Sequence, residues 1–100
     1  MTIPSIFREY LWLIKTIQNA GRISLREINQ KWLEEDFSEG IEIARTTFVR
    51  HRSAIEQMFG IRIGCDRKNG NAYYIENEQV LRDDTIQHWM LNTLTVNNII

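Results

Sequence analysis

Apolar residues recur every three or four positions in the first part of the chain, which is the spacing of an α-helix with one buried side. The segment SIFREYLWLIKTIQNAG, residues 5–21, carries apolar side chains at Phe7, Tyr10, Leu11, Ile14 and Ile17. Ser5 can cap the start of this helix, and Gly21 can take the left-handed conformation after its last turn. The pattern predicts a first helix that ends just before Gly21.

A second helix is predicted over ISLREINQKWLEE, residues 23–35, where Leu25, Ile28 and Trp32 give a narrow apolar side. Ser24 and Glu27 have the spacing of a capping box. The serine hydroxyl can accept from an amide of the first turn, and the glutamate carboxylate can accept from the cap amide.

An acidic loop follows the second helix in the segment EEDFSEGIEI. Ile41 and Ile43 alternate with polar residues after Gly40, and an alternating pattern indicates an extended strand. The sequence therefore predicts a very short strand at this point.

A third helix is predicted from about Thr46 to Phe59, with its end at Gly60. At 100° per residue, one side of it carries Phe48, Ile55, Met58 and Phe59, with His51 and Arg52 at the edges. The opposite side carries Thr46, Arg50, Ser53 and Gln57. Arg50 is therefore expected to point away from the core, whereas Arg52 could lie along the apolar stripe.

The period of the pattern changes to two after Gly60. The segment IRIGC alternates Ile61, Ile63 and Cys65, and AYYIE is a second candidate strand. The linking DRKNGN contains Asn-Gly, a strong hairpin signal. We predict a β-hairpin over residues 61–75, with Arg67 and Lys68 at its tip.

The tail LRDDTIQHWMLNTLTVNNII can form a fourth helix, with Ile86, Trp89, Met90 and Leu94 on one side. Chain termini are usually polar, whereas this chain ends in Asn-Asn-Ile-Ile. We expect the sequence to be the N-terminal part of a longer protein, with a domain over residues 1–76 and a linker helix over residues 77–100.

Composition is that of one globular domain, with 43% hydrophobic and 25% charged residues. The single cysteine, Cys65, cannot form an intramolecular disulfide and fits a reducing compartment. No apolar run approaches the roughly 20 residues of a membrane span, and Arg8 and Glu9 interrupt the region where a signal peptide would be apolar. We expect a cytoplasmic protein without a membrane partner.

Positive charge is concentrated in one segment. The net charge of the chain is -1, yet residues 44–74 hold six basic and two acidic side chains. The segments 1–43 and 75–100 are both net acidic. Such a local excess is typical of a surface that meets a polyanion.

The order helix, helix, short strand, helix and hairpin is that of a winged helix-turn-helix, a mainly α fold with a small β-hairpin (α+β). In such domains the helix before the hairpin enters the major groove of DNA. Arg50 can donate two hydrogen bonds to guanine, and Thr46 and Thr47 offer hydroxyls and first-turn amides. The predicted double-stranded DNA contacts are Arg22, Arg26, Arg45, Thr46, Thr47, Arg50, Ser53, Arg67, Lys68 and Asn69.

Three segments resemble the N-terminal portion of WYL-domain transcriptional regulators of Bacteroidetes: YLWLIKTIQNAGRISLREINQKW, RTTFVRHRSAIEQMFGIRIGCDRKNGNAYYIEN and DDTIQHWMLNTLTVNNII. The resemblance implies a winged-helix domain, a linker helix and then a ligand-sensing WYL domain, which these 100 residues lack. It also implies a homodimer in the intact protein, and an effector that acts only through the absent domain. It places the recognition helix at residues 46–53 and the wing at residues 67–71.

Other functions are less well supported by the sequence. His51, His88 and Cys65 lack the spacing of metal ligands, and we expect His51 at the edge of the third helix and Cys65 as a small apolar strand residue. No nucleophile motif or phosphate loop suggests an enzyme or a cofactor.

Two alternatives stay open at the level of sequence. Arg52 and Arg62 could either contact DNA or serve the fold. The domain as a whole could be a winged-helix protein-interaction module, because its loop and tail are acidic. Trp12 lies off the main stripe of the first helix, so we expect it, with Trp89, to meet the linker helix or a second subunit.

Overall fold

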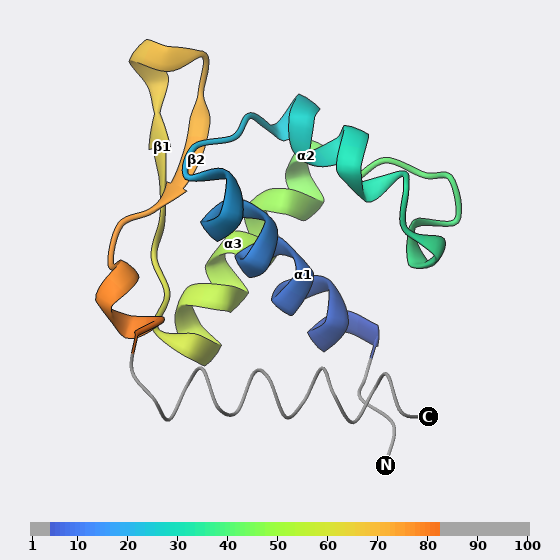
Figure 1. Cartoon of the computed structure of the whole chain (residues 1–100). Helices are drawn as coiled ribbons and strands as arrows, with labels where there is room; N and C mark the ends of the chain where they lie inside the picture. Colours follow the sequence, from blue (N-terminus) through green and yellow to red (C-terminus); the bar gives the residue numbers. More distant parts are fainter. Residues whose placement is uncertain (1–4, 83–100) are drawn as a thin grey trace.

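The computed structural model describes residues 5–82 of the 100-residue chain. Its helices and strands are α1 (Ser5–Ala20), α2 (Leu25–Trp32), α3 (Arg45–Phe59), β1 (Ile63–Asp66) and β2 (Ala72–Ile75). Short 3-10 turns lie at Asp36–Ser38, Arg67–Asn69 and Glu78–Val80. The hairpin rises beside the crossed helices α1 and α3 (Figure 1). The expected mainly helical α+β architecture with a small hairpin is thus confirmed.

Helix α1 contributes the largest share of the core. Its buried residues are Tyr10, Leu11, Leu13, Ile14 and Ile17. Leu13 was not part of the predicted stripe, yet its side chain is fully buried. The helix ends as expected, because Gly21 takes a φ of 78° and its amide donates to the carbonyl of Ile17 at 3.0 Å.

Helix α2 begins with the predicted capping box. The amide of Glu27 donates to Ser24 Oγ at 3.2 Å, and the amide of Ser24 donates to Glu27 Oε1 at 3.2 Å. The hydrogen bonds from Ser24 hold the pKa of the Glu27 carboxyl below its usual range. The helix is shorter than predicted, since it ends at Trp32, whose indole Nε1 donates to the carbonyl of Ile41 at 2.8 Å.

The strand expected at Ile41 and Ile43 is wrong. The backbone groups of Ile43 form hydrogen bonds with the buried side-chain amide of Asn29 instead. Asn29 Oδ1 accepts from the amide of Ile43 at 2.7 Å, and its Nδ2 donates to the carbonyl of the same residue at 3.1 Å. A side chain therefore satisfies the groups that a partner strand would have bonded.

A different residue adds the short extended segment beside the hairpin. Ile23, between α1 and α2, makes an isolated antiparallel bridge with Tyr73. The amide of Ile23 donates to the carbonyl of Tyr73 at 3.0 Å, and the reverse bond is 2.7 Å. The start of α2 is thereby fixed next to β2.

Helix α3 begins one residue before the predicted start and ends at Phe59, where Gly60 takes a φ of 70°. Phe48, His51 and Ile55 are buried as its inner side. The expectation that Met58 belongs to this stripe is wrong, because its side chain is 48% exposed. His51 takes its place and lies edge-on to Tyr10, with ring centroids 5.1 Å apart.

The hairpin pairs β1 with β2 in antiparallel register, from Ile63 opposite Ile75 to Asp66 opposite Ala72. Cys65 is half-buried in β1, as expected. The Asn-Gly signal marks the hairpin correctly, but the connection is a five-residue loop over residues 67–71. Its left-handed residues are Gly70 and Asn71, with φ values of 68° and 57°.

Trp12 packs inside the domain. Its ring lies 5.3 Å from that of Trp32 and 6.1 Å from that of Phe37, and its Nε1 donates to Glu35 Oε1 at 3.1 Å. These contacts tie the loop after α2 to α1. Trp89, which we expected to join Trp12 in a contact to the linker helix or a second subunit, lies outside the described residues, as does the predicted fourth helix from residue 83 onward.

The chain after the hairpin stays attached to the core. Asn77 is buried, accepts from the amide of Arg62 at 2.8 Å and donates to the carbonyl of Gly60 at 2.7 Å. Leu81 is 1% exposed. The packed structure therefore extends past residue 76 at least as far as Leu81.

Candidate nucleic-acid interface

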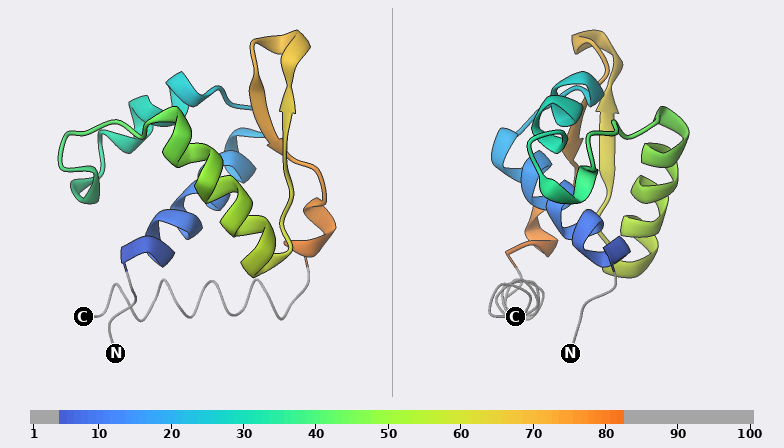
Figure 2. Two further views of the ribbon diagram at one scale, coloured as in Figure 1. Left: turned by 180° about the vertical axis from the view of Figure 1, so that it is seen from behind. Right: turned by 90° about the vertical axis from the view of Figure 1, so that its right-hand side faces the viewer.

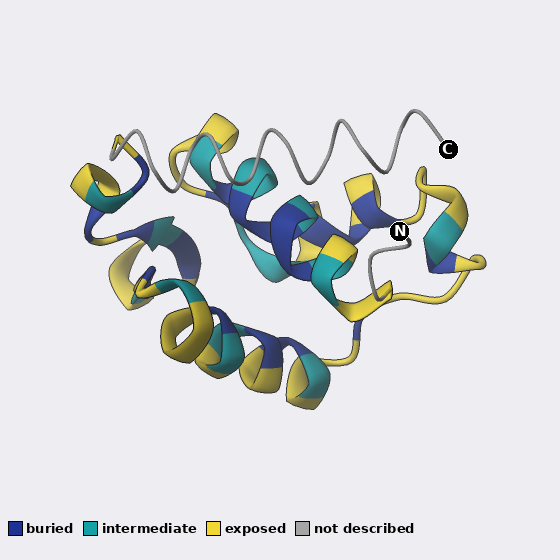
Figure 3. Ribbon diagram, turned by 90° about the horizontal axis from the view of Figure 1, so that it is seen from below, coloured by how far each residue is buried: buried dark blue, intermediate teal, exposed yellow. Residues whose placement is uncertain are grey.

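One side of α3 is open to solvent over its whole length. We call it the outer face and define it by the exposed residues Thr46, Val49, Arg50, Ser53 and Gln57. It lies opposite the buried residues Phe48, His51 and Ile55. Figure 3 shows this division along α3, which has a dark blue inner side and a yellow outer side at the lower edge of the view. The predicted orientation of Arg50 is confirmed.

The first turn of α3 has no side-chain cap. Ala44 occupies the cap position, and the first turn contains no acidic residue. Helix α2 differs in both respects, because Ser24 caps it and Glu27 lies in its first turn. The start of α3 therefore presents amide groups and a positive helix dipole, a combination that favours an anion.

Three predicted contact residues surround this turn. Arg45 and Thr46 are exposed, and Thr47 is half-buried. Ser53 is exposed two turns further along, on the same side as Arg50. The helix thus combines small polar side chains with long basic ones, so that another backbone could approach closely.

Other predicted residues gather at the same end of the molecule. The hairpin loop, the first turn of α2 and the start of α3 all lie at the top of Figure 1, and the right-hand view of Figure 2 shows the same grouping. Arg26 in α2, and Arg67, Lys68 and Asn69 in the loop, are exposed. The structure therefore brings residues from three segments to one end of the fold.

Arg22 has a second role at this end. Its Nη1 lies 2.6 Å from Asp66 Oδ2, and its guanidinium lies 4.6 Å from the ring centroid of Tyr74. These contacts join the turn before α2 to the hairpin. If Arg22 contacts a phosphate as predicted, it does so while also holding the hairpin through Asp66 and Tyr74.

Asp66 organises the hairpin loop. Its Oδ2 accepts from Asn69 Nδ2 at 2.7 Å, and its Oδ1 accepts from the amide of Lys68 at 3.2 Å. The hydrogen bond from Asn69, followed by the charge of Arg22, holds the pKa of Asp66 below its usual range. The side chain of Asn69 is therefore hydrogen-bonded within the loop, whereas those of Arg67 and Lys68 are exposed.

Arg52 and Arg62 both have partners within the fold. Arg52 Nε donates to the carbonyl of Ile63 at 2.6 Å, and its guanidinium lies 5.6 Å from the ring centroid of Tyr73. Arg62 pairs with Glu76 at 3.5 Å. By contrast, within residues 5–82 no salt bridge involves Arg26, Arg45, Arg50, Arg67 or Lys68.

A groove of about 290 Å³ lies between the outer face of α3 and the base of the hairpin. It is lined by Val49, Arg52, Ser53, Glu56, Arg62, Ile63 and Glu76. The sequence interpretation did not single out Val49. The helical wheel could have found it, because it places Val49 next to Ser53 on the side opposite the apolar stripe.

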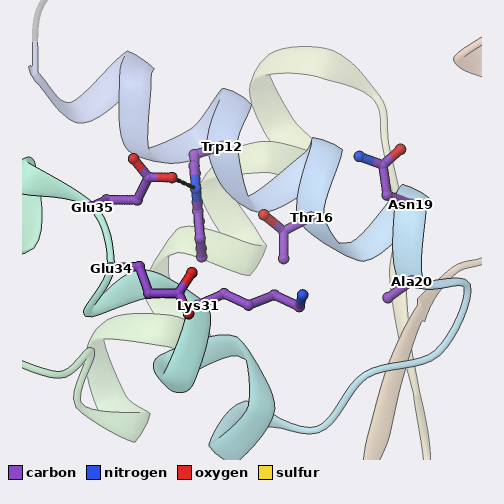
Figure 4. Close-up of a pocket in the computed structure, with 7 residues that line it drawn as sticks. All are labelled: Trp12, Thr16, Asn19, Ala20, Lys31, Glu34 and Glu35. Atoms are coloured by element: carbon purple, nitrogen blue, oxygen red, sulfur yellow. Dashed lines mark hydrogen bonds between the residues drawn. The ribbon is translucent and has the colours of Figure 1, made fainter.

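A second hollow of about 340 Å³ lies between α1 and the end of α2. Figure 4 shows the residues that line it, with the carboxylate of Glu35 bonded to the indole of Trp12 and with Lys31 and Glu34 at the rim. Its polar lining has both signs of charge. It contains none of the predicted contact residues.

His51 is buried against Tyr10, as expected for a residue packed at the edge of α3. Burial holds the pKa of its imidazole below the usual value, against the opposing charge of Glu9. Among the residues that the structure describes, no three His, Cys, Asp or Glu side chains gather as metal ligands would. None of the helices in that part of the chain is long and apolar enough to cross a membrane.

No family model, no curated protein and no solved structure matches the chain in comparisons with known proteins.

Proposed function

We propose that the chain is the sequence-specific DNA-binding domain of a bacterial transcriptional regulator, with a winged helix-turn-helix fold. In this proposal α3 is the recognition helix and lies in the major groove, while the hairpin is the wing and meets the flanking backbone. The observation that carries the proposal is the outer face of α3, which is exposed along its length and holds Arg50 among small polar residues.

The charge distribution supports the same function. The predicted basic residues at the starts of α2 and α3 and on the hairpin loop share one end of the molecule (Figure 1). Phosphate contacts from such residues would fix the register of the protein on the duplex. Arg50 would then supply base discrimination through two hydrogen bonds to guanine.

The resemblance to WYL-domain regulators extends the proposal beyond the described residues. We propose a cytoplasmic protein that acts as a homodimer, in which residues 77–100 include a linker helix to a ligand-sensing domain. Any effector would act through that domain.

Selection of bound duplexes from a random pool, followed by titration of the selected site, tests this function. Arg50→Ala should weaken binding to the selected duplex by about 5- to 150-fold, the value of one bidentate base contact. It should also broaden the preference at one base pair. Circular dichroism should be unchanged, since the side chain is exposed.

Arg82→Ala is the charge-matched control, because Arg82 is exposed, pairs with Glu78 after the hairpin and is not among the predicted DNA contacts. It should keep the base preference of the parent chain. Equal base preference in the Arg50→Ala and Arg82→Ala variants would refute the role of Arg50, and failure to enrich any duplex would refute the function.

A protein-interaction module is the second candidate, and one observation favours it. The loop after α2 exposes Leu33 and Ile41, at 42% and 67%, beside the acidic residues 34–36. Retention on duplex DNA that is lost with added salt distinguishes DNA binding from this alternative, for which no such retention is expected.

A further inference from the structure

Val49 is the one apolar residue of the outer face of α3, and its side chain is 50% exposed. Single exposed apolar residues are common on protein surfaces, so exposure alone indicates no function. Its position gives it significance. It lies one residue before Arg50, and on the helix surface it neighbours Thr46 and Ser53, three residues before it and four after.

The side chain of Val49 is directed toward the hairpin side of the outer face. It lines the groove at the base of the hairpin together with Ser53 and Glu56. A ligand lying along α3 would meet a polar row from Thr46, Arg50 and Ser53 and, beside it, one apolar contact point.

That contact point is rigid. Valine is branched at Cβ and has one strongly preferred χ1 rotamer in a helix. Its two methyl groups are therefore held in a fixed direction before any ligand binds, and little side-chain entropy is lost on contact. Valine also disfavours the helix slightly relative to alanine, so local helix stability does not account for its presence.

The major groove of DNA offers one apolar group to such a side chain. Guanine, cytosine and adenine present donors and acceptors at their major-groove edges, whereas thymine also presents its C5-methyl group. A valine cannot hydrogen-bond to any base edge, but it can bury that methyl group.

We propose, resting on the DNA-binding function above, that Val49 is a specificity-determining residue that packs on the C5-methyl group of a thymine. That thymine lies beside the base bound by Arg50. The site recognised by α3 thus contains a 5-methylpyrimidine at a fixed position relative to the arginine contact.

Replacement of each thymidine of the selected duplex by deoxyuridine, one at a time, tests this inference with the full 100-residue chain. The exchange removes one methyl group and leaves every hydrogen-bonding group of the base in place. One position should lose about three- to fivefold in affinity, the effect of exposing one buried methyl group. Val49→Ala should bind the thymidine and deoxyuridine duplexes equally at that position.

Met58→Ala is the matched control, because Met58 is 48% exposed on the same helix but lies off the outer face. It should retain the preference for thymidine. Both variants should stay folded, since alanine favours a helix at either exposed position.

Two results would overturn the inference while leaving the proposed function intact. The first is equal affinity for all singly substituted duplexes, with Arg50→Ala still changing the base preference. The second is a thymidine preference that persists unchanged in Val49→Ala. If the random pool yields no bound duplex, the proposed function and this inference fall together.

Discussion

Arg50 and Arg52 are two residues apart in α3, and their neighbours give them different tasks. The guanidinium of Arg52 donates to the carbonyl of Ile63 and lies over Tyr73. The side chain of Arg50 leaves the helix on the opposite side and is exposed. The two positions differ by 200° around the helix axis. Arg52 therefore holds β1 in place, whereas Arg50 is free to bind a ligand.

Asn29 shows how one polar side chain can replace an element of secondary structure. It is 6% exposed, and both ends of its amide are bonded to the backbone of Ile43. The loop that leads from α2 into α3 is fixed by these two bonds. The start of α3, and with it the uncapped first turn, is positioned in consequence.

Asn29→Ala should lower the free energy of unfolding by about 2–4 kcal/mol, because it leaves a buried amide and a buried carbonyl without partners. Urea denaturation followed by circular dichroism measures the change. Gln30→Ala, at the neighbouring exposed position of α2, is the control and should stay within about 0.5 kcal/mol of the parent chain. A loss for Asn29→Ala no larger than for the control would show that water replaces these bonds.

At the scale of elements, prediction from sequence worked where the signals are local. The capping box of Ser24 and Glu27 and the glycine after α3 fixed helix ends to within a few residues, because both act over a single turn. The helical wheel also placed Arg50 on the open side. These features depend only on residues close in sequence.

Prediction failed where a distant residue decides the structure. The alternation of Ile41 and Ile43 indicated a strand, but the backbone of Ile43 is bonded by Asn29, more than ten residues earlier, and the carbonyl of Ile41 by the indole of Trp32. Ile23 joined the hairpin although no period-two pattern marks it. Prediction of the candidate site failed for the same reason, because no residue near Arg22 in sequence indicates that it pairs with Asp66.

The hairpin depends on a close approach at Gly64. This glycine is buried opposite Tyr74, and a Cβ atom there would lie 2.7 Å from Tyr74 Cζ and 2.9 Å from Glu76 Cγ. The ring of Tyr74 can therefore lie across β1, where Arg22 stacks on it at 4.6 Å. The glycine thus supports the contact that joins the hairpin to the turn before α2.

Gly64→Ala should lower the stability by about 1–3 kcal/mol, because the added methyl group overpacks the strand and displaces the tyrosine ring. Thermal denaturation measures the loss, and hydrogen exchange should increase most in the hairpin. Cys65→Ala, in the same strand but half-buried, controls for changes to β1 in general. If the two variants melt alike and exchange alike, the close approach does not constrain the hairpin.

At the scale of the whole molecule, one acidic loop and one basic loop are separated. The acidic residues 34–36 lie in the loop after α2, away from the hairpin loop that carries Arg67 and Lys68 (Figure 1). A separation of this kind orients a molecule in the field of a polyanion before contact. The net charge of -1 conceals it.

Affinity for the selected duplex should therefore fall steeply with salt. If about four phosphates are neutralised, the slope of log K against log salt concentration should be about -3 to -4. Lys68→Ala should make the slope shallower by about 1 and weaken all sequences similarly. Lys31→Ala, an exposed lysine beside the second hollow, should leave the slope unchanged; equal slopes in both variants would contradict a phosphate contact by Lys68.

The two sides of α3 are subject to different constraints on sequence change. Phe48, His51 and Ile55 are fixed by packing, whereas the residues on the open side have no buried contact to lose. Exchanging them alters what the surface can recognise at almost no cost to folding. The same fold could therefore acquire new targets by successive substitutions at Thr46, Val49, Arg50 and Ser53. Each substitution would leave the fold stable even before it improves binding to a new target.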